Sequence, residues 1–321
     1  MSVLKIGFVG CGAPAYTHRD RLVNRDGIEL VGCQDTHTEQ AESFAAALNL
    51  PVFKDVVSLY EKARPDAVYI TVPPETHGDI ELEAVARGIH FYVETPIAPD
   101  LQTARAISAA IAKSKVLAMA GYSRRHNDLT HTARQFLGTE VISLATGRSY
   151  CPAPASPPSS HRKPANCHLL EEVSHVIDLL LYLCGPVSEV HALSVRGSLS
   201  RSDNFDLEES AVINLRLKTG AVASITATCV LNHATGINLE VITPCFSLVL
   251  TDTTLRVQET FKATDYLSQT DVRTKETDAF IHALQQGKPG GLRTSYREAV
   301  KTFRICLAVQ ESIRTGLPVL L

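Results

Sequence analysis

The chain has 321 residues, of which 45% are hydrophobic and 20% are charged, and its formal net charge is -3. This length exceeds what one hydrophobic core normally fills, so two domains of a soluble globular protein are expected. The charge balance excludes a basic field for nucleic acid, and no apolar run reaches the roughly 18 residues of a membrane span. The eight cysteines form no CxxC pair and no regular spacing, which indicates free, buried thiols in a reducing cytoplasmic compartment and no metal site.

Residues 1–122 alternate between strand and helix patterns. Short apolar runs predict strands at 3–10, 28–35, 66–73, 89–94 and 115–121. Helical spacing, closed by glycine in one case, predicts helices at 13–25, 38–50, 77–88 and 100–114. Strands that alternate with helices form a parallel sheet covered on both faces, so an α/β domain is expected here.

The pattern changes after residue 122. A strand at 140–150 is followed by the proline- and serine-rich segment 151–167, which reads as a loop, and then by a helix at 168–186 that Gly185-Pro186 stops. Short alternating runs with a hairpin signal, Lys218 to Gly220, predict an antiparallel sheet over 187–258. Two further helices are predicted at 276–289 and 295–316. The last, about 293–316, is expected to return to the first domain, which makes 123–292 the second domain.

A glycine-rich turn follows the first predicted strand. The segment "GCGAPA", with Gly10, Gly12, Ala13 and Pro14, fits G-x-G-x-x-A and opens a helix. Glycines there allow a tight turn and the approach of a pyrophosphate to a helix N-terminus, as in Rossmann domains. Asp35 ends the second strand, where a carboxylate accepts hydrogen bonds from the ribose of NAD and repels the 2′-phosphate of NADP. NAD is therefore the predicted cofactor, in preference to NADP, and a plain turn beside a surface aspartate is the alternative.

The carboxyl ends of two other strands carry further candidate cofactor contacts. "TVPPETH" places Thr71 and Pro73 in a stiff loop at the sheet edge where cofactors bind. His77 follows at a helix start, and a structural role is favoured for it. "YVETP" places Glu94 and Thr95 at the end of the next strand.

The helix at 168–186 carries a polar stripe on an otherwise apolar surface. Glu171, His175, Asp178 and Tyr182 are spaced i, i+4, i+7 and i+11, so they share one face. A histidine can act as a general base near neutral pH, with neighbouring carboxylates orienting it. A structural histidine in a satisfied polar network is the alternative.

Taken in order and spacing, these segments resemble the glucose–fructose oxidoreductase / inositol dehydrogenase / MocA (Gfo/Idh/MocA) family over nearly the whole chain. The resemblance includes His18 in the opening motif, the "HFYVETP" segment, "GYSRRHND" and the helix "EEVSHVID". It implies a Rossmann domain followed by an α/β domain with an open, mainly antiparallel sheet. It also implies NAD(P)-dependent chemistry on a secondary alcohol or ketone of a sugar, inositol or related polyol. A homodimer or homotetramer through the open sheet is implied as well, with no nucleic acid or membrane partner.

The resemblance also assigns catalytic positions, and this chain departs from the family at two of them. The family lysine of Glu-Lys-Pro is Thr95 here, and the family aspartate four residues before His175 is Glu171. The implied catalytic set is His175, Glu171, Asp178 and Thr95, with Glu94 near the nicotinamide ribose. Because threonine carries no positive charge, an active dehydrogenase would need other groups to replace the lysine as a stabiliser of the developing alkoxide. The candidate replacements and substrate contacts are His161, Arg162, Lys163 and His168, and Tyr122, Arg124 and Arg125.

The missing lysine leaves two alternatives open beside the dehydrogenase. One is a glycoside hydrolase that oxidises, eliminates and re-reduces with a retained NAD. The other is a catalytically inactive, nucleotide-sensing regulator with the same fold.

Overall fold

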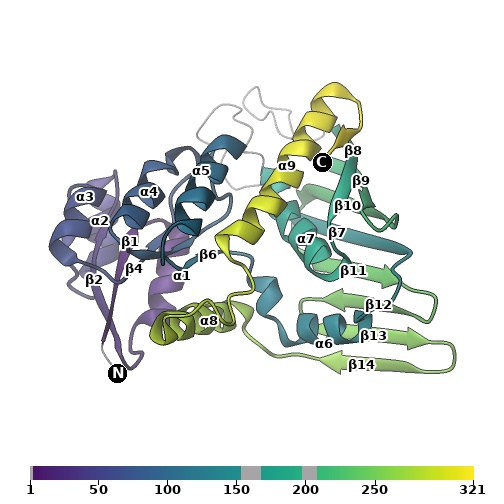
Figure 1. Cartoon of the computed structure of the whole chain (residues 1–321), viewed down its shortest axis with the longest axis horizontal. Helices are drawn as coiled ribbons and strands as arrows, with labels where there is room; N and C mark the ends of the chain where they lie inside the picture. The colour runs from purple at the N-terminus through teal and green to yellow at the C-terminus, as the bar shows by residue number, and fades with distance from the viewer. Residues whose placement is uncertain (1–2, 153–167, 197–207) are drawn as a thin grey trace. The chain divides into compact units, whose positions relative to one another are not determined.

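The computed structural model describes residues 3–152, 168–196 and 208–321 (Figure 1). The chain divides into two compact units, residues 1–123 with 273–300 and residues 124–272 with 301–321. In the parts that are described, no helix has both the length and the apolar character needed to cross a membrane. The described cysteines are free, as predicted, and all except Cys245 are buried.

The first unit is built on a six-stranded sheet with the order β3-β2-β1-β4-β5-β6, in which every neighbouring pair is parallel. This confirms the predicted Rossmann architecture and adds the short strand β3, which was not among the predicted elements. The strands are β1 (Leu4–Val9), β2 (Ile28–Gln34), β3 (Val52–Phe53), β4 (Ala67–Ile70), β5 (His90–Val93) and β6 (Ala118–Ala120).

Helices cover both faces of this sheet, which is why all four residues of the central strand β4 are buried. On one face, Phe8 packs on Phe44 with ring centroids 5.0 Å apart, and Tyr69 packs edge-on against Phe280 at 5.7 Å. The helical segments of this unit are α1 (Ala13–Leu22), α2 (Thr38–Ala46), α3 (Val56–Ser58), η1 (Leu59–Ala63), η2 (Pro74–Thr76), α4 (Asp79–Ala86), α5 (Leu101–Ala112) and α8 (Val272–Gln286).

The second unit contains a nine-stranded sheet with the order β14-β13-β12-β11-β7-β10-β9-β8-β15. Its pairs are antiparallel except for β7 and β10, which run parallel at the centre, so the predicted mainly antiparallel sheet is confirmed. The strands are β7 (Leu144–Pro152), β8 (Val187–Val195), β9 (Ser210–Leu217), β10 (Val222–Leu231), β11 (Gly236–Ile242), β12 (Phe246–Thr251), β13 (Thr254–Glu259), β14 (Ala263–Leu267) and β15 (Val319–Leu320).

Helix α7 (His168–Cys184) lies against one face of this sheet (Figure 1). Val176 on the helix joins Ile225 and Leu239 on the strands in one apolar core. A Cβ atom on Gly147 of β7 would lie 2.7 Å from Cγ1 of Val176, so the helix rests directly on the strand backbone. The other helical segments here are η3 (Ser123–His126), α6 (Asp128–Leu137) and the later part of α9 (Tyr296–Thr315).

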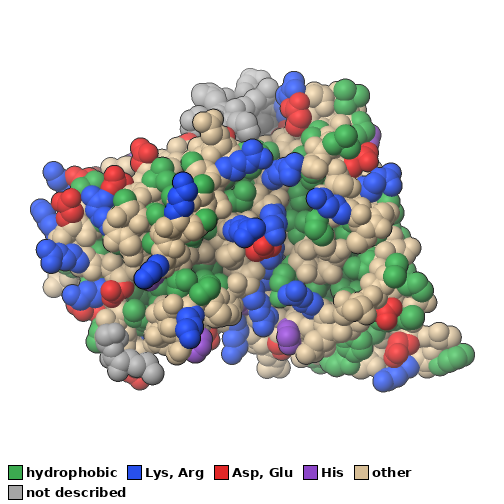
Figure 2. Space-filling model, in the orientation of Figure 1, with side chains coloured by type: hydrophobic (Ala, Val, Ile, Leu, Met, Phe, Trp, Pro, Cys, Tyr) green, Lys and Arg blue, Asp and Glu red, His purple; other side chains and the backbone are tan. Residues whose placement is uncertain are grey.

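Helix α6 was not among the predicted elements. Its start is fixed by Asn127, whose side chain accepts a hydrogen bond from the backbone N–H of Leu129 at 2.8 Å. Towards the β13–β14 end of the sheet, exposed hydrophobic side chains lie among charged ones (Figure 2), and Phe261 in the turn between these strands is 99% exposed.

Candidate functional site

The turn after β1 has a backbone that only glycine fits. Gly10 has φ +87°, and a Cβ atom there would lie 2.5 Å from the carbonyl oxygen of Thr71. The hydroxyl of Thr71 donates to the Gly10 carbonyl at 2.9 Å, which fixes the approach of the two strand ends. Gly12 then forms the N-cap of α1 without a side-chain cap, and Pro14 lies in the first turn. Pro14 has no N–H, and the N–H of Ala15 donates to the Gly12 carbonyl at 2.9 Å, which leaves the N–H of Ala13 for an anionic group.

Asp35 lies directly after β2, beside this turn. One carboxylate oxygen accepts the backbone N–H of Cys11 at 2.8 Å, and the other accepts that of His37 at 2.8 Å. The side chain is only 10% exposed. The carboxylate is therefore held in one orientation by the glycine-rich turn and by its own following residues.

The loop after β4 contains the next predicted contacts. Pro73 is exposed, whereas His77 is buried, and its Nδ1 lies 2.6 Å from Oε1 of Glu81. The other Glu81 oxygen accepts the N–H of Gly78 at 2.7 Å, and both the His77 and Glu81 side chains are fully buried. His77 is thus tied into the first turn of its own helix.

Glu94 and Thr95 follow the last residue of β5. Oε1 of Glu94 lies 2.8 Å from Nε2 of His18 on α1, and Glu94 is 25% exposed while His18 is 3% exposed. Thr95 is partly exposed, and the Thr95–Pro96 peptide is cis. The structure thus joins the opening motif to the "YVETP" segment through a histidine that the sequence placed in that motif.

A buried polar group lies on the same side of the sheet. The Tyr92 hydroxyl donates to Oε2 of Glu276 at 3.0 Å, and Glu276 is 2% exposed. Burial, followed by the nearby charge of Glu94, raises the pKa of Glu276 well above its ordinary 4.5. Sequence reasoning did not single out Glu276, although a signal existed: this acid shares the buried stripe of α8 with Phe280 and Leu284.

The polar stripe of α7 in the second unit separates into an open and a closed part. Glu171 is exposed and His175 is partly buried. Asp178 is buried and accepts two hydrogen bonds from Arg125, at 2.7 and 2.6 Å, and one from Thr302 at 2.8 Å. The Tyr182 ring lies under the Arg125 guanidinium at 4.9 Å. Asp178 therefore anchors Arg125, which the sequence offered as a substrate contact.

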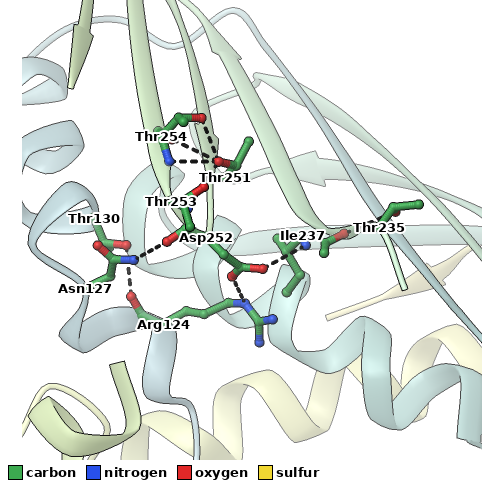
Figure 3. A network of polar contacts seen from close by, with 10 residues as sticks. Arg124, Asn127, Thr130, Thr235, Ile237, Thr251, Asp252, Thr253 and Thr254 are labelled. Atoms are coloured by element: carbon green, nitrogen blue, oxygen red, sulfur yellow. Dashed lines mark hydrogen bonds and ion pairs between the residues drawn. The ribbon is translucent and has the colours of Figure 1, made fainter. Parts of the chain in front are cut away.

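Arg124, the other arginine offered as a substrate contact, is held in a structural network (Figure 3). Its Nε donates to Asp252 at 2.8 Å, and the second Asp252 oxygen accepts the N–H of Ile237 at 3.3 Å. Asn127 donates to the Asp252 carbonyl at 2.9 Å, and Thr130 donates to the Arg124 carbonyl at 2.9 Å. These contacts fasten η3 to the end of β12.

Of the remaining predicted substrate contacts, Tyr122 is described in full, whereas the four in or next to the segment 151–167 are not. Tyr122 is 3% exposed in the first unit. His161, Arg162 and Lys163 lie outside the described residues, and His168 is described only as the first residue of α7. No group of three or more metal-binding side chains occurs among the residues that the structure describes.

Two family models match this chain, one in each half. Residues 4–122 match "Oxidoreductase family, NAD-binding Rossmann fold", and residues 136–246 match "GFO/IDH/MocA C-terminal domain".

Relatives of known name agree with these matches. An inositol 2-dehydrogenase 4 of Saccharopolyspora erythraea is 29% identical over 69% of this chain and 66% of its own length. A scyllo-inositol 2-dehydrogenase (NAD(+)) of Bacillus subtilis is 23% identical over 98% of this chain and 96% of its own. An Agrobacterium radiobacter oxidoreductase solved with NAD+, L-tartaric acid and magnesium has the same fold, with a TM-score of 0.85 at 16% identity over 99% of this chain and 98% of its own. With both of its halves matched by models of one family, the chain belongs to the Gfo/Idh/MocA oxidoreductases, whose N-terminal domain is an NAD-binding Rossmann fold.

Proposed function

We propose that this chain uses NAD to oxidise a secondary alcohol, or to reduce the matching ketone, on a sugar, inositol or related polyol. One observation carries the proposal: the uncapped N-terminus of α1 and the fixed carboxylate of Asp35 lie at the same sheet edge, joined through the N–H of Cys11. The names of the relatives, inositol 2-dehydrogenases among them, support the substrate class.

The choice of NAD over NADP rests on Asp35. Its carboxylate is fixed by two backbone N–H groups and can accept further hydrogen bonds from ribose hydroxyls. A 2′-phosphate would bring a second negative charge to the same place. The N–H of Ala13 at the start of α1 would face the pyrophosphate, and Thr71, Pro73 and Glu94 would line the remaining sheet edge.

The chemistry falls to two groups of side chains. NAD, when bound, supplies the hydride acceptor. His175 would take the proton of the reacting hydroxyl, with Glu171 one helical turn away to stabilise the imidazolium. Thr95 would donate a hydrogen bond in place of the charge that a lysine gives, and Asp178 would act indirectly, by fixing Arg125. A cation from His161, Arg162, Lys163 or His168 that completes the site stays a prediction.

The first test is cofactor binding by the purified protein and its Asp35→Ser variant. Quenching of protein fluorescence should give a lower Kd for NADH than for NADPH in the wild type. Asp35→Ser should narrow this preference by about tenfold or more, because the repelling charge is gone. No binding of either nucleotide would contradict the proposal.

The second test is turnover on a panel of polyols and keto-sugars, followed by the absorbance of reduced nicotinamide. Oxidation by the wild type and its loss in His175→Ala support the dehydrogenase. Glycoside cleavage without net NADH would instead support the hydrolase, and nucleotide binding without any turnover would support the regulator.

We also infer that the chain assembles as a homodimer or homotetramer through the sheet face opposite α7. Leu193, Val195, Val212 and Val222 on β8, β9 and β10 are each more than 40% exposed there. Apolar side chains exposed on one face of a sheet are a common feature of interfaces. Light scattering of the wild type and of a Leu193→Glu/Val212→Glu variant would test it, with a monomeric wild type as the contrary result.

A further inference from the structure

Glu94 has different neighbours at its two carboxylate oxygens. Oε1 lies 2.8 Å from Nε2 of His18. On the other side, a Cβ atom placed on Gly121 would lie 2.6 Å from Oε2 of Glu94 and 2.8 Å from the hydroxyl oxygen of Tyr92. The Tyr92 hydroxyl and the second oxygen of Glu94 thus flank the same backbone position. Tyr92 is thus a nearby phenol whose proton could compete with His18 for this carboxylate.

That competition does not occur in the structure, because the Tyr92 hydroxyl donates to Glu276 at 3.0 Å. Both residues are almost wholly buried, so this hydrogen bond is shielded from water. The Tyr92 ring is in turn held between His18, at a centroid distance of 4.7 Å, and Tyr69, at 5.0 Å. Rotation of the ring away from Glu276 is therefore blocked on both sides.

Glu276 has no ion-pair partner among the described residues at salt-bridge distance. The charged groups around it do not offset the rise in its pKa that burial causes. Glu94 lies on the β5 side and disfavours a second negative charge. Arg273 on α8 and Arg21 on α1 act in the opposite sense but more weakly than burial. Burial and Glu94 thus shift Glu276 towards its neutral form, and its Oε2 accepts from Tyr92.

We propose that Glu276 is a positioning residue for Glu94: by holding the hydroxyl proton of Tyr92, it leaves Glu94 with His18 as its partner and presents the carboxylate unaltered to the cofactor site. The placing of Glu94 beside the nicotinamide ribose rests on the proposed function. The contacts of Glu276, Tyr92 and His18 do not.

Three variants separate positioning from packing. Glu276→Ala frees the Tyr92 proton, for which Oε2 of Glu94, beside the same Gly121 backbone position, is a candidate acceptor. Glu276→Gln keeps a neutral acceptor of the same shape. The double variant Tyr92→Phe/Glu276→Ala removes the acceptor and the competing proton together. A packing role predicts that the double variant is at least as damaged as Glu276→Ala, whereas positioning predicts rescue.

The readout is the pair of ring ¹⁵N chemical shifts of His18, which report the proton on each nitrogen and do not require cofactor. Glu276→Ala should change them, while Glu276→Gln, Tyr92→Phe and the double variant should keep wild-type values. Tyr69→Phe, which deletes the hydroxyl of the adjacent stacked ring, is the matched control and should also match the wild type. Unchanged shifts in Glu276→Ala, or failure of the double variant to restore them, would overturn the proposal.

If Glu276→Ala does not fold, Tyr92→Phe and Glu276→Gln still decide, because altered His18 shifts in either variant contradict the proposed role. NADH binding is measured on the same proteins, with a loss of about tenfold expected in Glu276→Ala and recovery in the double variant. His18 shifts that follow the expected pattern in a protein that binds no NADH would support positioning and refute the proposed function. NADH binding by the wild type with unresponsive His18 shifts would do the reverse.

Discussion

Asp178 and Glu276 are both 2% exposed, yet their surroundings give them opposite chemistry. Asp178 receives two hydrogen bonds from a guanidinium and one from a hydroxyl. Glu276 receives one hydrogen bond from a phenol, and its strongest charged influence is another carboxylate. Equal burial therefore keeps one acid as half of an ion pair and favours the neutral form of the other. The partners, and not the exposed fraction, decide what a buried carboxyl group does.

The largest expected effect comes from breaking the Asp178 ion pair. Asp178→Ala removes the carboxylate that receives two hydrogen bonds from Arg125, whose side chain is 3% exposed, and so takes a counter-charge away from a buried cation. The free energy of unfolding should fall by about 3–5 kcal/mol. Urea unfolding followed by circular dichroism measures it. Arg256→Ala is the control, because the Arg256–Asp265 pair is more than half exposed and its loss should cost no more than about 1 kcal/mol. Equal losses in the two variants would contradict this account.

His175 lies less than one helical turn from Asp178, but its replacement should lower activity strongly and stability only slightly. His175→Ala removes the proposed general base and should lower kcat by roughly 100- to 10,000-fold. Because the side chain is only partly buried, the free energy of unfolding should change by about 1 kcal/mol or less. Steady-state kinetics and urea unfolding on one preparation test both. His131→Ala, on the exposed side of α6, should alter neither, and a fully active His175→Ala would exclude the assigned role.

The Glu276 side of the comparison predicts a pH effect. Because its pKa is raised above 4.5 in the folded protein, the unfolded chain releases this proton first as the pH rises. The folded state then binds more protons than the unfolded state. The stability that Glu276 contributes is therefore present at low pH and is lost as pH rises through its folded pKa, by up to about 1.4 kcal/mol per pH unit. The difference in Tm between the wild type and Glu276→Gln, measured from pH 4 upwards, should follow this slope. A constant difference would mean that Glu276 does not titrate in this range.

The smallest effect is expected where the acid is paired but half exposed. Asp252 is 40% exposed beside Arg124, so solvent screens the pair. Asp252→Asn keeps acceptor capacity for Ile237 and should lower the free energy of unfolding by about 1 kcal/mol or less. A loss of stability as large as that of Asp178→Ala would show that the exposure of an ion pair does not determine how much it contributes to stability.

Much of the fold of the first unit could be predicted from the sequence, whereas the contacts of the two buried acids, Asp178 and Glu276, could not. Strand–helix alternation, Gly10 and Asp35 are local signals, and the parallel sheet followed from them. The stripe on α7 was visible as a helical period, but Arg125 and Thr302 are 53 and 124 positions from Asp178. Tyr92 and Glu276 are 184 positions apart. The parallel β7–β10 pair likewise joins segments far apart in the sequence. Such pairings depend on tertiary packing, which no local period encodes.

Gly147 affects the position of His175 through apolar packing and not through a polar contact. Val176 packs directly against the backbone of Gly147, because the glycine has no side chain. This contact sets the distance between α7 and the sheet, and with it the position of the adjacent His175. A methyl group added at Gly147 would push α7 away from the sheet, because the β-branched side chain of Val176 cannot easily change rotamer to make room for it. A shift of about 1 Å in a reacting group can cost about 100-fold in rate. The packing of the apolar interior of this unit therefore sets the position of His175, the proposed general base.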